Sequence, residues 1–366
     1  MKVIFICYNY FTLYKAIYTA NNKYSAYDST IIYRNTISKI PKVKEFNGKI
    51  IEVNPIRRIL NRKNKYFNFI SEVILTKKIN KVMKNELHTY SKAILVVFKD
   101  QLLLESTIVS EFKRLGNISK KVELLEEGLG LYEKKIDSLN KNSIGNSIFE
   151  NIGISNYFLR KNPQGYNPLI DEIICGDPKK LKKLKSRKNL QITQQPNMFS
   201  EENSMFFMTN ILGFPKNLIE KYKRFNYIFL TQSTLENINQ VEEELKIIKE
   251  IKRVFKEEIL VKKHPRDNSE FSFSTIPGVT EVPKEFQIIP FECFCAVINE
   301  PIIITYYSSA YKNILQENDK AKVILLYKLL NDQRINKLMN DLEEDNNPRI
   351  MIPNSIEELK VLLGKN

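Results

Sequence analysis

Short apolar runs rich in β-branched residues alternate with helix-like stretches along most of this chain, and this alternation limits the possible fold more than any other feature. In the first half the runs are KVIFIC, STIIYR, GKIIEV and AILVVFK. In the second half they are YIFLTQS, EILVKKHP, PIIITYYSSAY and KVILLY. Repeated strand–helix units favour parallel sheets that helices cover on both faces. The sequence therefore predicts an α/β protein.

The length of the chain and one polar tract predict two domains. At 366 residues the chain is long for a single domain. A polar, proline-containing tract over 186–203 lies between the two series of strand–helix units, and we interpret it as the connector. We place a Rossmann-like domain over 1–200 and a second over 201–366, with the last helix, SIEELKVLLGK, as a candidate to pack back on the first domain. Two such domains in tandem predict a ligand cleft at the carboxyl ends of their strands.

The net charge of +15 calls for an anionic partner or a solvated lysine-rich surface. Basic runs cover Arg57–Lys65 and Lys179–Lys188. Each run could meet lipid headgroups, an anionic substrate or nucleic acid, although each alone is more typical of a solvated face. No helix-turn-helix, RNP or zinc-finger pattern makes nucleic acid specific. A membrane surface and an anionic substrate both stay open.

The cysteines and the apolar segments indicate a cytoplasmic protein. Cys7, Cys175, Cys293 and Cys295 form no CxxC pair, and two histidines are too few to complete a zinc site. Buried free thiols are the simpler interpretation, and they fit a reducing compartment. The apolar run after Met1 is shorter than a signal peptide or a membrane span requires, so we expect it to form the first strand.

One acidic cluster, Glu126-Glu127-Gly128, follows a predicted strand. Adjacent residues of an extended chain point in opposite directions, so we expect at most one of the two carboxylates to face a ligand. Gly128 would allow a backbone conformation that brings substrate close. A carboxylate placed there could act as a general base, and a solvated acidic turn is the alternative.

Two further polar clusters also follow predicted strands, Lys262–Pro265 and Ser308-Ser309. Lysines beside His264 disfavour its protonated form unless an anion such as phosphate binds there. The two serine hydroxyls precede a predicted helix, where free N–H groups also favour phosphate; a plain helix cap is an equal alternative. His88 has no comparable surroundings, and we interpret it as structural.

The motifs that usually hold metal or nucleotide phosphate are missing. The chain has no Asp-x-Asp, no P-loop and no complete GxGxxG. We therefore expect no metal and no cofactor, with phosphate charge met by histidine, lysine, serine and a helix terminus.

Taken together, these motifs resemble those of the bacterial sialyltransferases, most closely the lipooligosaccharide sialyltransferases (glycosyltransferase family 52). The resemblance rests on LLEEGLGLYE, His264-Pro265 and Ser308-Ser309, which occur in the family order and span Met1 to about Ala310. The segment CYNYFTLYKA keeps the family's cysteine and following helix but lacks its Thr-Pro.

The resemblance implies a GT-B-like fold, two Rossmann-like domains facing a central cleft. It also implies inverting, metal-independent transfer of sialic acid from CMP-sialic acid to a terminal galactose of a bacterial lipooligosaccharide or capsule. Glu127 would be the base, with Glu126 as its fallback, and His264 would assist the departing phosphate. Acids in the 236–242 region, Glu236 and Glu242, stay open as alternatives for the base.

The remaining implied roles concern donor and acceptor contacts. The donor-binding set is Lys262, Pro265, Glu292, Ser308, Ser309 and Gln232, in which Lys262 would contact cytidine and Glu292 the ribose hydroxyls. The set assigned to acceptor or loop support is Glu126, Gly128 and Asn9. The implied partners are CMP-sialic acid and a galactose-terminated glycan or glycolipid, with α2,3 linkage, peripheral contact at the inner membrane surface and a homodimer left open, and no nucleic acid expected.

Three other functions stay open at this point. The chain could be a GT-B transferase that uses another nucleotide sugar, or one that makes polysialic acid. It could also be a non-catalytic basic protein that binds nucleic acid or an anionic polymer, which would show donor-independent binding with a steep dependence on salt.

Overall fold

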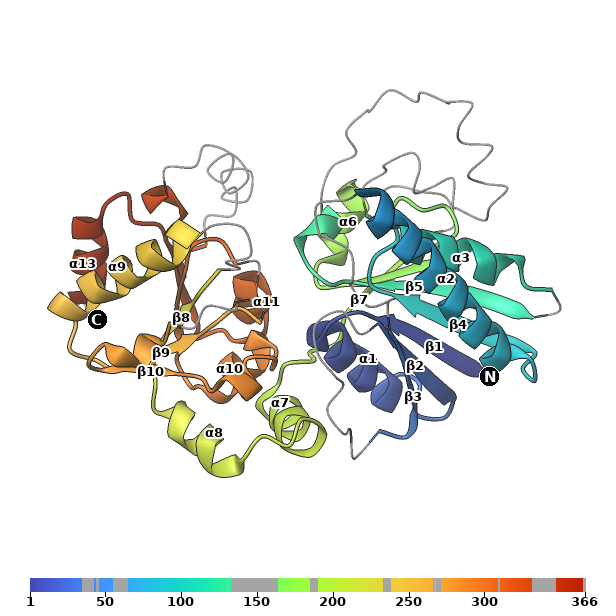
Figure 1. Cartoon of the computed structure of the whole chain (residues 1–366), viewed down its shortest axis with the longest axis horizontal. Coiled ribbons are helices and arrows are strands. Elements are labelled where there is room, and N and C mark those ends of the chain that lie inside the picture. Colours follow the sequence, from blue (N-terminus) through green and yellow to red (C-terminus); the bar gives the residue numbers. More distant parts are fainter. Residues whose placement is uncertain are drawn as a thin grey trace, which may run out of the picture. The chain divides into compact units, whose positions relative to one another are not determined.

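The computed structural model describes residues 1–34, 43, 46–54, 65–116, 118–132, 164–184, 190–232, 238–265, 267, 271–308, 310–330 and 347–364. The chain divides into two compact units, Met1–Met198 and Phe199–Asn366, each with its own sheet (Figure 1). The sequence-based boundary after residue 200 lies close to this division.

The first unit is built on a seven-stranded sheet in the order β3-β2-β1-β4-β5-β6-β7, and every pair of neighbouring strands is parallel. Strands β1, β2 and β3 therefore extend the sheet in one direction, and β4 then pairs with the other edge of β1. Ligands of such sheets bind at this reversal, outside the carboxyl ends of the strands. The strands are β1 (Lys2–Cys7), β2 (Asp28–Arg34), β3 (Gly48–Val53), β4 (Lys92–Val97), β5 (Ser119–Leu125), β6 (Glu172–Cys175) and β7 (Gln191–Gln194).

Helices cover both faces of this sheet, as strands without a polar face require. On one face lie α2 (Lys65–Leu87), α3 (Leu103–Arg114) and α6 (Pro178–Leu184), whose apolar side chains share a core with every second residue of the central strands. The other face carries α1 (Tyr10–Asn22) (Figure 1). Asn9 begins α1 with a capping box: its Oδ1 accepts from the backbone N–H of Thr12 at 2.8 Å, and Thr12 Oγ1 accepts from the N–H of Asn9 at 3.2 Å.

The second unit repeats the same topology with six parallel strands in the order β10-β9-β8-β11-β12-β13. Here the reversal lies between β8 and β11. The strands are β8 (Tyr227–Leu230), β9 (Ile259–Lys262), β10 (Val279–Glu281), β11 (Ile302–Thr305), β12 (Lys322–Leu325) and β13 (Ile350–Met351). The helices are α7 (Glu201–Phe206), α8 (Lys216–Lys223), α9 (Ile238–Val254), α10 (Phe291–Val297), α11 (Ala310–Glu317) and α13 (Ile356–Gly364). The predicted α/β class with two Rossmann-like domains is confirmed.

One sequence-based expectation is corrected. The predicted connector, 186–203, contains β7, a short edge strand that is half-exposed and too polar to stand out as an apolar run. The last helix, α13, packs on α9 within the second unit, where Leu359 and Leu363 belong to the core, and its contact with the first domain stays a prediction.

The described residues include all four cysteines but only part of the two basic runs. Most of Arg57–Lys65 lies outside the described residues, while α6, from the second run, buries Leu181 and exposes its lysines. All four cysteines are buried and free. Within the described ranges, no helix has the length and apolar character to cross a bilayer.

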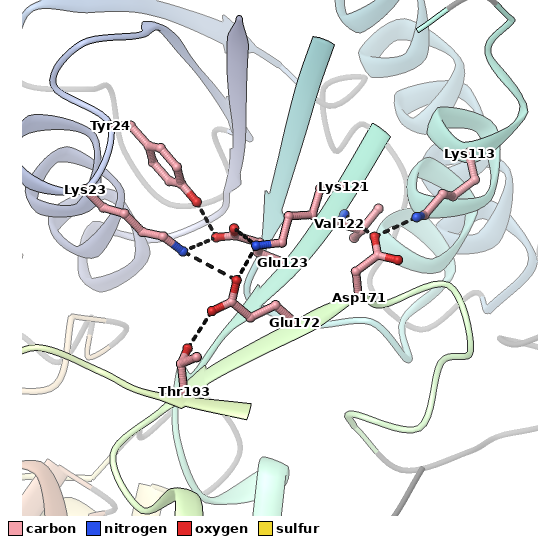
Figure 2. A network of polar contacts seen from close by, with 9 residues as sticks. All are labelled: Lys23, Tyr24, Lys113, Lys121, Val122, Glu123, Asp171, Glu172 and Thr193. Atoms are coloured by element: carbon pink, nitrogen blue, oxygen red, sulfur yellow. Dashed lines mark hydrogen bonds and ion pairs between the residues drawn. The ribbon is translucent and has the colours of Figure 1, made fainter. Parts of the chain in front are cut away.

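A buried ionic network joins β5, β6 and α1 on the face opposite α2 and α3 (Figure 2). Glu123 and Glu172 lie side by side on neighbouring strands, and their side chains are 0% and 5% exposed. Lys121 ion-pairs with both, and Lys23 lies 2.8 Å from Glu123 and 3.7 Å from Glu172. Tyr24 donates a further hydrogen bond to Glu123. Two like charges can be buried together here because two cations compensate them.

Replacing Lys121 with Met should lower the free energy of unfolding by about 2 kcal/mol at pH 7, because two buried carboxylates would then share one cation. Burial raises the pKa of Glu172, but the bonds from Lys121 and Thr193 outweigh it, so the net pKa is below its ordinary value of 4.5. That stabilisation is present above pH 4.5 and is lost as pH falls through the lowered pKa. Denaturant unfolding of wild type and Lys121→Met should therefore differ most at pH 7 and converge below about pH 4.

Lys92→Met is the matched control, since Lys92 is an exposed lysine on β4 that makes no ion pair within the described part of the chain. It should change stability by no more than about 0.5 kcal/mol. Equal losses in the two variants would show that the network contributes nothing specific.

Candidate active site

Four side chains meet at the carboxyl edge of the first sheet, beside its reversal point. Tyr8 and Asn9 follow β1, Lys99 follows β4 and Glu127 follows β5. Asn9 Nδ2 donates to Glu127 Oε1 at 3.2 Å, and Lys99 Nζ lies 3.2 Å from Glu127 Oε2. Lys99 also lies 5.0 Å from the centre of the Tyr8 ring. We call these four residues the Glu127 cluster. Its carboxylate is held by an amide and a cation while its side chain stays 17% exposed.

Glu126 points away from this cluster, in agreement with the alternation expected for adjacent residues. Its Oε2 accepts from the Tyr132 hydroxyl at 2.8 Å and from the backbone N–H of Gly176 at 2.6 Å. Its carbonyl oxygen accepts from Lys15 Nζ at 2.6 Å. Glu126 is 7% exposed, and these bonds tie β5 to the turn after β6 and to α1. Glu126, the fallback for the base, thus makes hydrogen bonds that stabilise the fold.

The prediction that Gly128 provides an unusual backbone conformation is wrong. Glycines with a positive φ in the described residues are Gly165, Gly213 and Gly278, so Gly128 adopts a backbone conformation open to any residue. A Cβ added at Gly128 would have no heavy atom within 4 Å. The glycine contributes open space next to Glu127 instead of an unusual turn.

Tyr8 and Lys99 were not selected from the sequence. Tyr8 directly follows β1, and Lys99 comes two residues after β4, as Glu127 does after β5, so the rule that selected Glu127 would also have selected them. Burial, and then the charge of Glu127, raise the pKa of the Tyr8 hydroxyl well above its ordinary value. Tyr8 is therefore a neutral hydroxyl at physiological pH, and Lys99 is the cation of the cluster.

The His-Pro motif lies at the carboxyl end of β9 in the second unit. The backbone N–H of His264 donates to Thr231 Oγ1, at the end of β8, at 3.0 Å. The N–H of Asp267 donates to the carbonyl oxygen of His264 at 2.8 Å and closes a turn around Pro265. His264 is half-buried and Pro265 is exposed. These two bonds hold the backbone of His264 at the carboxyl edge of the sheet, and its contact with phosphate stays a prediction.

Gln232 links the two strands that flank the reversal of the second sheet. Its Nε2 donates to Thr305 Oγ1 on β11 at 3.0 Å, and its N–H donates to Glu244 Oε1 on α9 at 2.7 Å. Gln232 is 7% exposed, so this residue, predicted to contact the donor, also fixes the spacing of β8 and β11. Of the open alternatives for the base, Glu242 is exposed on α9 and Glu236 lies outside the described residues.

The two lysines before His264 are both buried but point to opposite faces of the sheet. Lys262 Nζ donates to the carbonyl oxygen of Gln287 at 2.7 Å. Burial lowers the pKa of Lys262 to about 8, against the opposing charge of Glu292. Lys263 instead lies 3.4 Å from Glu281 in an ion pair. The predicted cytidine contact, Lys262, is therefore a buried ammonium that no described carboxylate pairs within 4 Å.

Glu292 lies in the first turn of α10, where the helix dipole favours a carboxylate. It is 6% exposed and accepts a hydrogen bond from Asn313 Nδ2 on α11 at 3.0 Å. Glu292 and Cys295 line a cavity of about 520 Å³ in the second unit, between α10, α11 and the start of α7. Ser308 precedes α11, and its Oγ accepts from the N–H of Ala310 at 3.4 Å. Ser309 lies outside the described residues.

The structure thus gathers the predicted residues into two groups. The Glu127 cluster lies on the first unit. The second group, on the second unit, consists of Gln232, Lys262, His264, Pro265, Glu292 and Ser308, and its members follow or face the carboxyl ends of β8, β9 and β11. The residues predicted to support the acceptor and those predicted to bind the donor thus belong to separate Rossmann-like units.

No model of a known protein family matches the sequence, and no curated protein matches it. Solved structures do match. The GT-B domain of a sialyltransferase from Photobacterium damselae has a TM-score of 0.56 at 12% identity, over 96% of this chain and 100% of that one. An α/β-galactoside α-2,3-sialyltransferase from Photobacterium phosphoreum has a TM-score of 0.56 at 15% identity, over 98% and 99%. Phytolacca americana UGT2, with UDP-2-fluoro-glucose and pterostilbene, has a TM-score of 0.55 at 11% identity, over 100% and 89%.

These matches show the fold: the chain has the GT-B-like architecture of two Rossmann-like domains. The resemblance to bacterial sialyltransferases is confirmed at the level of fold. Assignment to the lipooligosaccharide family, and every residue role, stays a prediction, because identities of 12% and 15% establish no individual residue.

Replacing Lys262 with Met should raise the free energy of unfolding by about 2 kcal/mol at pH 7. The native state binds this proton less tightly than the unfolded state, because the folded pKa is about 8 and the ordinary value is 10.5. The loss of stability from burying this ammonium is fully present below pH 8 and disappears as pH rises to 10.5. The difference in free energy of unfolding between Lys262→Met and wild type should therefore vanish over that range. Denaturant unfolding at pH 7, 9 and 10.5 measures it.

Lys263→Met provides a control of opposite sign. Its loss leaves Glu281 without the ion pair, so this variant should be less stable than wild type at pH 7. If Lys262→Met also proved less stable, the ammonium would be contributing more to the fold than its burial costs.

Proposed function

We propose that the protein is an inverting sialyltransferase that moves sialic acid from CMP-sialic acid to a terminal galactose of a bacterial surface glycan, lipooligosaccharide or capsule, without a metal or cofactor. One observation carries the proposal. In a GT-B-like fold, a buried lysine, Lys262, is influenced by the charge of a buried carboxylate, Glu292, and the His-Pro turn begins two residues after this lysine. A buried cation kept at such a cost is typical of a binding site.

In this proposal the second unit binds the donor. Glu292 would accept hydrogen bonds from the two ribose hydroxyls, and Lys262 would contact the cytidine. Ser308, Ser309 and the N–H groups that begin α11 would bind the phosphate, a combination of hydroxyls and helix terminus that favours anions. His264, half-buried at the end of β9, would donate to the same phosphate.

The first unit would supply the base. Glu127 takes the proton of the galactose hydroxyl, whose oxygen then bonds to C2 of sialic acid while the bond from C2 to the phosphate oxygen breaks. The electron pair of that bond leaves with CMP, and His264 stabilises the resulting charge by hydrogen bonding or proton donation. Asn9 and Lys99 hold the Glu127 carboxylate in place. Acid and base assistance of this kind is worth about 10²–10⁴-fold in rate.

The remaining parts of the proposal concern the acceptor and its location. We infer an α2,3 linkage, as in the named activity of the Photobacterium phosphoreum neighbour. A galactose-terminated glycolipid would be met at the cytoplasmic side of the inner membrane. The exposed lysines of α6, together with the rest of the basic runs, would favour a peripheral contact with anionic lipid there. A homodimer is compatible with this arrangement.

Nucleotide binding tests the donor. CMP at about 100 times its dissociation constant should stabilise the protein by about 2.7 kcal/mol, a rise of about 3–4 °C in melting temperature. UDP and GDP should give less than 1 °C, and EDTA should leave the CMP effect unchanged. A shift with UDP instead would point to a GT-B transferase for another sugar. No shift with any nucleotide would overturn the proposal and favour a protein that binds an anionic polymer.

Substitution of His264 tests the chemistry. His264→Ala should lower kcat for transfer to lactose at least about 100-fold, because the phosphate leaves without help. Glu127→Gln should have a similar effect, while CMP should still stabilise it. His88→Ala is the matched control, since His88 is the other histidine, lies exposed after α2 and should keep full activity. Wild-type rates in His264→Ala would remove His264 from the mechanism.

A further inference from the structure

A groove on the surface of the first unit lies between the neighbouring helices α2 and α3, and none of the proposed site residues lines it (Figure 1). We call it the α2–α3 groove, and its volume is about 360 Å³. Its basic lining consists of Lys77, Lys81 and Lys84, all exposed side chains of α2. Because they are spaced at i, i+4 and i+7, the three lysines share one side of the helix over about 10 Å.

The groove carries an excess of positive charge. Lys77 and Lys81 make no ion pair within the described ranges, and Lys84 lies 3.7 Å from Glu111 of α3. Glu111 also pairs with Arg114, at 3.3 Å, so it does not neutralise Lys84 alone. The exposed amide of Asn85 lines the groove as well and can donate hydrogen bonds. Ammonium groups beside amide donors favour a phosphate group as ligand.

One end of the groove is apolar. Val73 and Leu103 line it on the side where the two helices begin, and the lysines follow toward the helix ends. Ile70, one turn before Val73, is 52% exposed, and Leu102, directly before Leu103, is 42% exposed. Exposed aliphatic side chains next to a row of lysines are typical of a surface that lies on a membrane.

This apolar end lies at the carboxyl edge of the first sheet, the edge that also carries the Glu127 cluster. Leu102 comes three residues after Lys99, a member of that cluster. The short helix α6, with its exposed lysines, covers the same face of the sheet as α2 and α3. A bilayer in contact with the groove would therefore lie beside the edge at which the acceptor is proposed to bind.

The lining of the groove favours lipid over nucleic acid. Surfaces that bind single-stranded nucleic acid place aromatic side chains where bases can stack. The apolar lining of this groove is aliphatic instead, from Val73 and Leu103. The exposed Ile70 and Leu102 offer nothing to a phosphodiester backbone, but they can enter the boundary between headgroups and acyl chains.

We propose that the α2–α3 groove binds the phosphate groups of an anionic lipid bilayer, with Ile70 and Leu102 entering its interface. The proposal deepens the proposed function and rests on it for the glycolipid acceptor that this contact would bring to the Glu127 cluster. Each lysine near an anionic surface increases binding by about fivefold, so three lysines together contribute about 100-fold.

Sedimentation with vesicles tests the contact. Vesicles of phosphatidylcholine with about 30 mol% phosphatidylglycerol should bind the wild type at least about tenfold more tightly than pure phosphatidylcholine. The triple variant Lys77→Gln, Lys81→Gln and Lys84→Gln should bind the anionic vesicles about 100-fold more weakly. Ile70→Ser should weaken binding by about tenfold, because a half-exposed aliphatic side chain no longer leaves water.

The matched control removes three exposed lysines from the second unit: Lys246→Gln, Lys249→Gln and Lys256→Gln. The net charge changes equally, but binding should stay within about twofold of wild type, since salt screens distant charges. Equal losses in the two triple variants would reflect overall charge and overturn the proposal. A wild type that ignores anionic vesicles but binds an oligonucleotide through the three groove lysines would overturn it in favour of nucleic acid.

Two acceptors relate the contact to the proposed function. On a galactose-terminated glycolipid in anionic vesicles, the groove variant should lose at least about tenfold in rate at limiting acceptor. On soluble lactose it should keep the wild-type kcat and KM, because the groove contains no site residue. An equal loss on both acceptors would overturn the proposal. Vesicle binding through the groove by a protein that CMP does not stabilise would keep the contact and overturn the proposed function; CMP stabilisation without vesicle binding would do the reverse.

Discussion

Parallel strand pairing is the constraint on which the rest of this structure depends. In a parallel sheet every carboxyl end reaches the same edge, so residues far apart in sequence become neighbours there. In the first unit this edge joins Asn9, Lys99 and Glu127. In the second it joins Thr231 to His264 and Gln232 to Thr305. Both units have the same strand order, so both present their polar groups beside a reversal of the sheet.

The buried charges of this molecule differ in how fully neighbouring groups compensate them. In the network of Figure 2, Glu123 and Glu172 share two lysines, and every charge has a partner. Lys262 has a backbone carbonyl and a carboxylate near it without a close ion pair, and Glu105 has an oxygen with no described hydrogen bond. Incomplete compensation costs stability, and such sites persist where a ligand or a reaction uses them.

Alternation along an extended chain assigns different roles to adjacent residues of the same type. Glu126 turns inward to bind Tyr132 and Gly176, while Glu127 faces Asn9 and Lys99. Lys262 and Lys263 separate in the same way, one toward Gln287 and one toward Glu281. Two adjacent residues of the same type therefore contact different parts of the fold, and at most one of them can face a given site.

The sequence by itself determined the α/β class, most of the strands and the strand-end clusters, because periodicity and β-branched content depend on local spacing. It could not find β7, whose four residues are too polar to signal a strand, nor the place of α13, which depends on contacts with α9. Only the tertiary structure decided that Tyr8, Asn9 and Lys99 surround Glu127, and that Gly128 needs no special φ. Burial and the distances between strand ends arise only when the sheet assembles, and they set which charges are compensated.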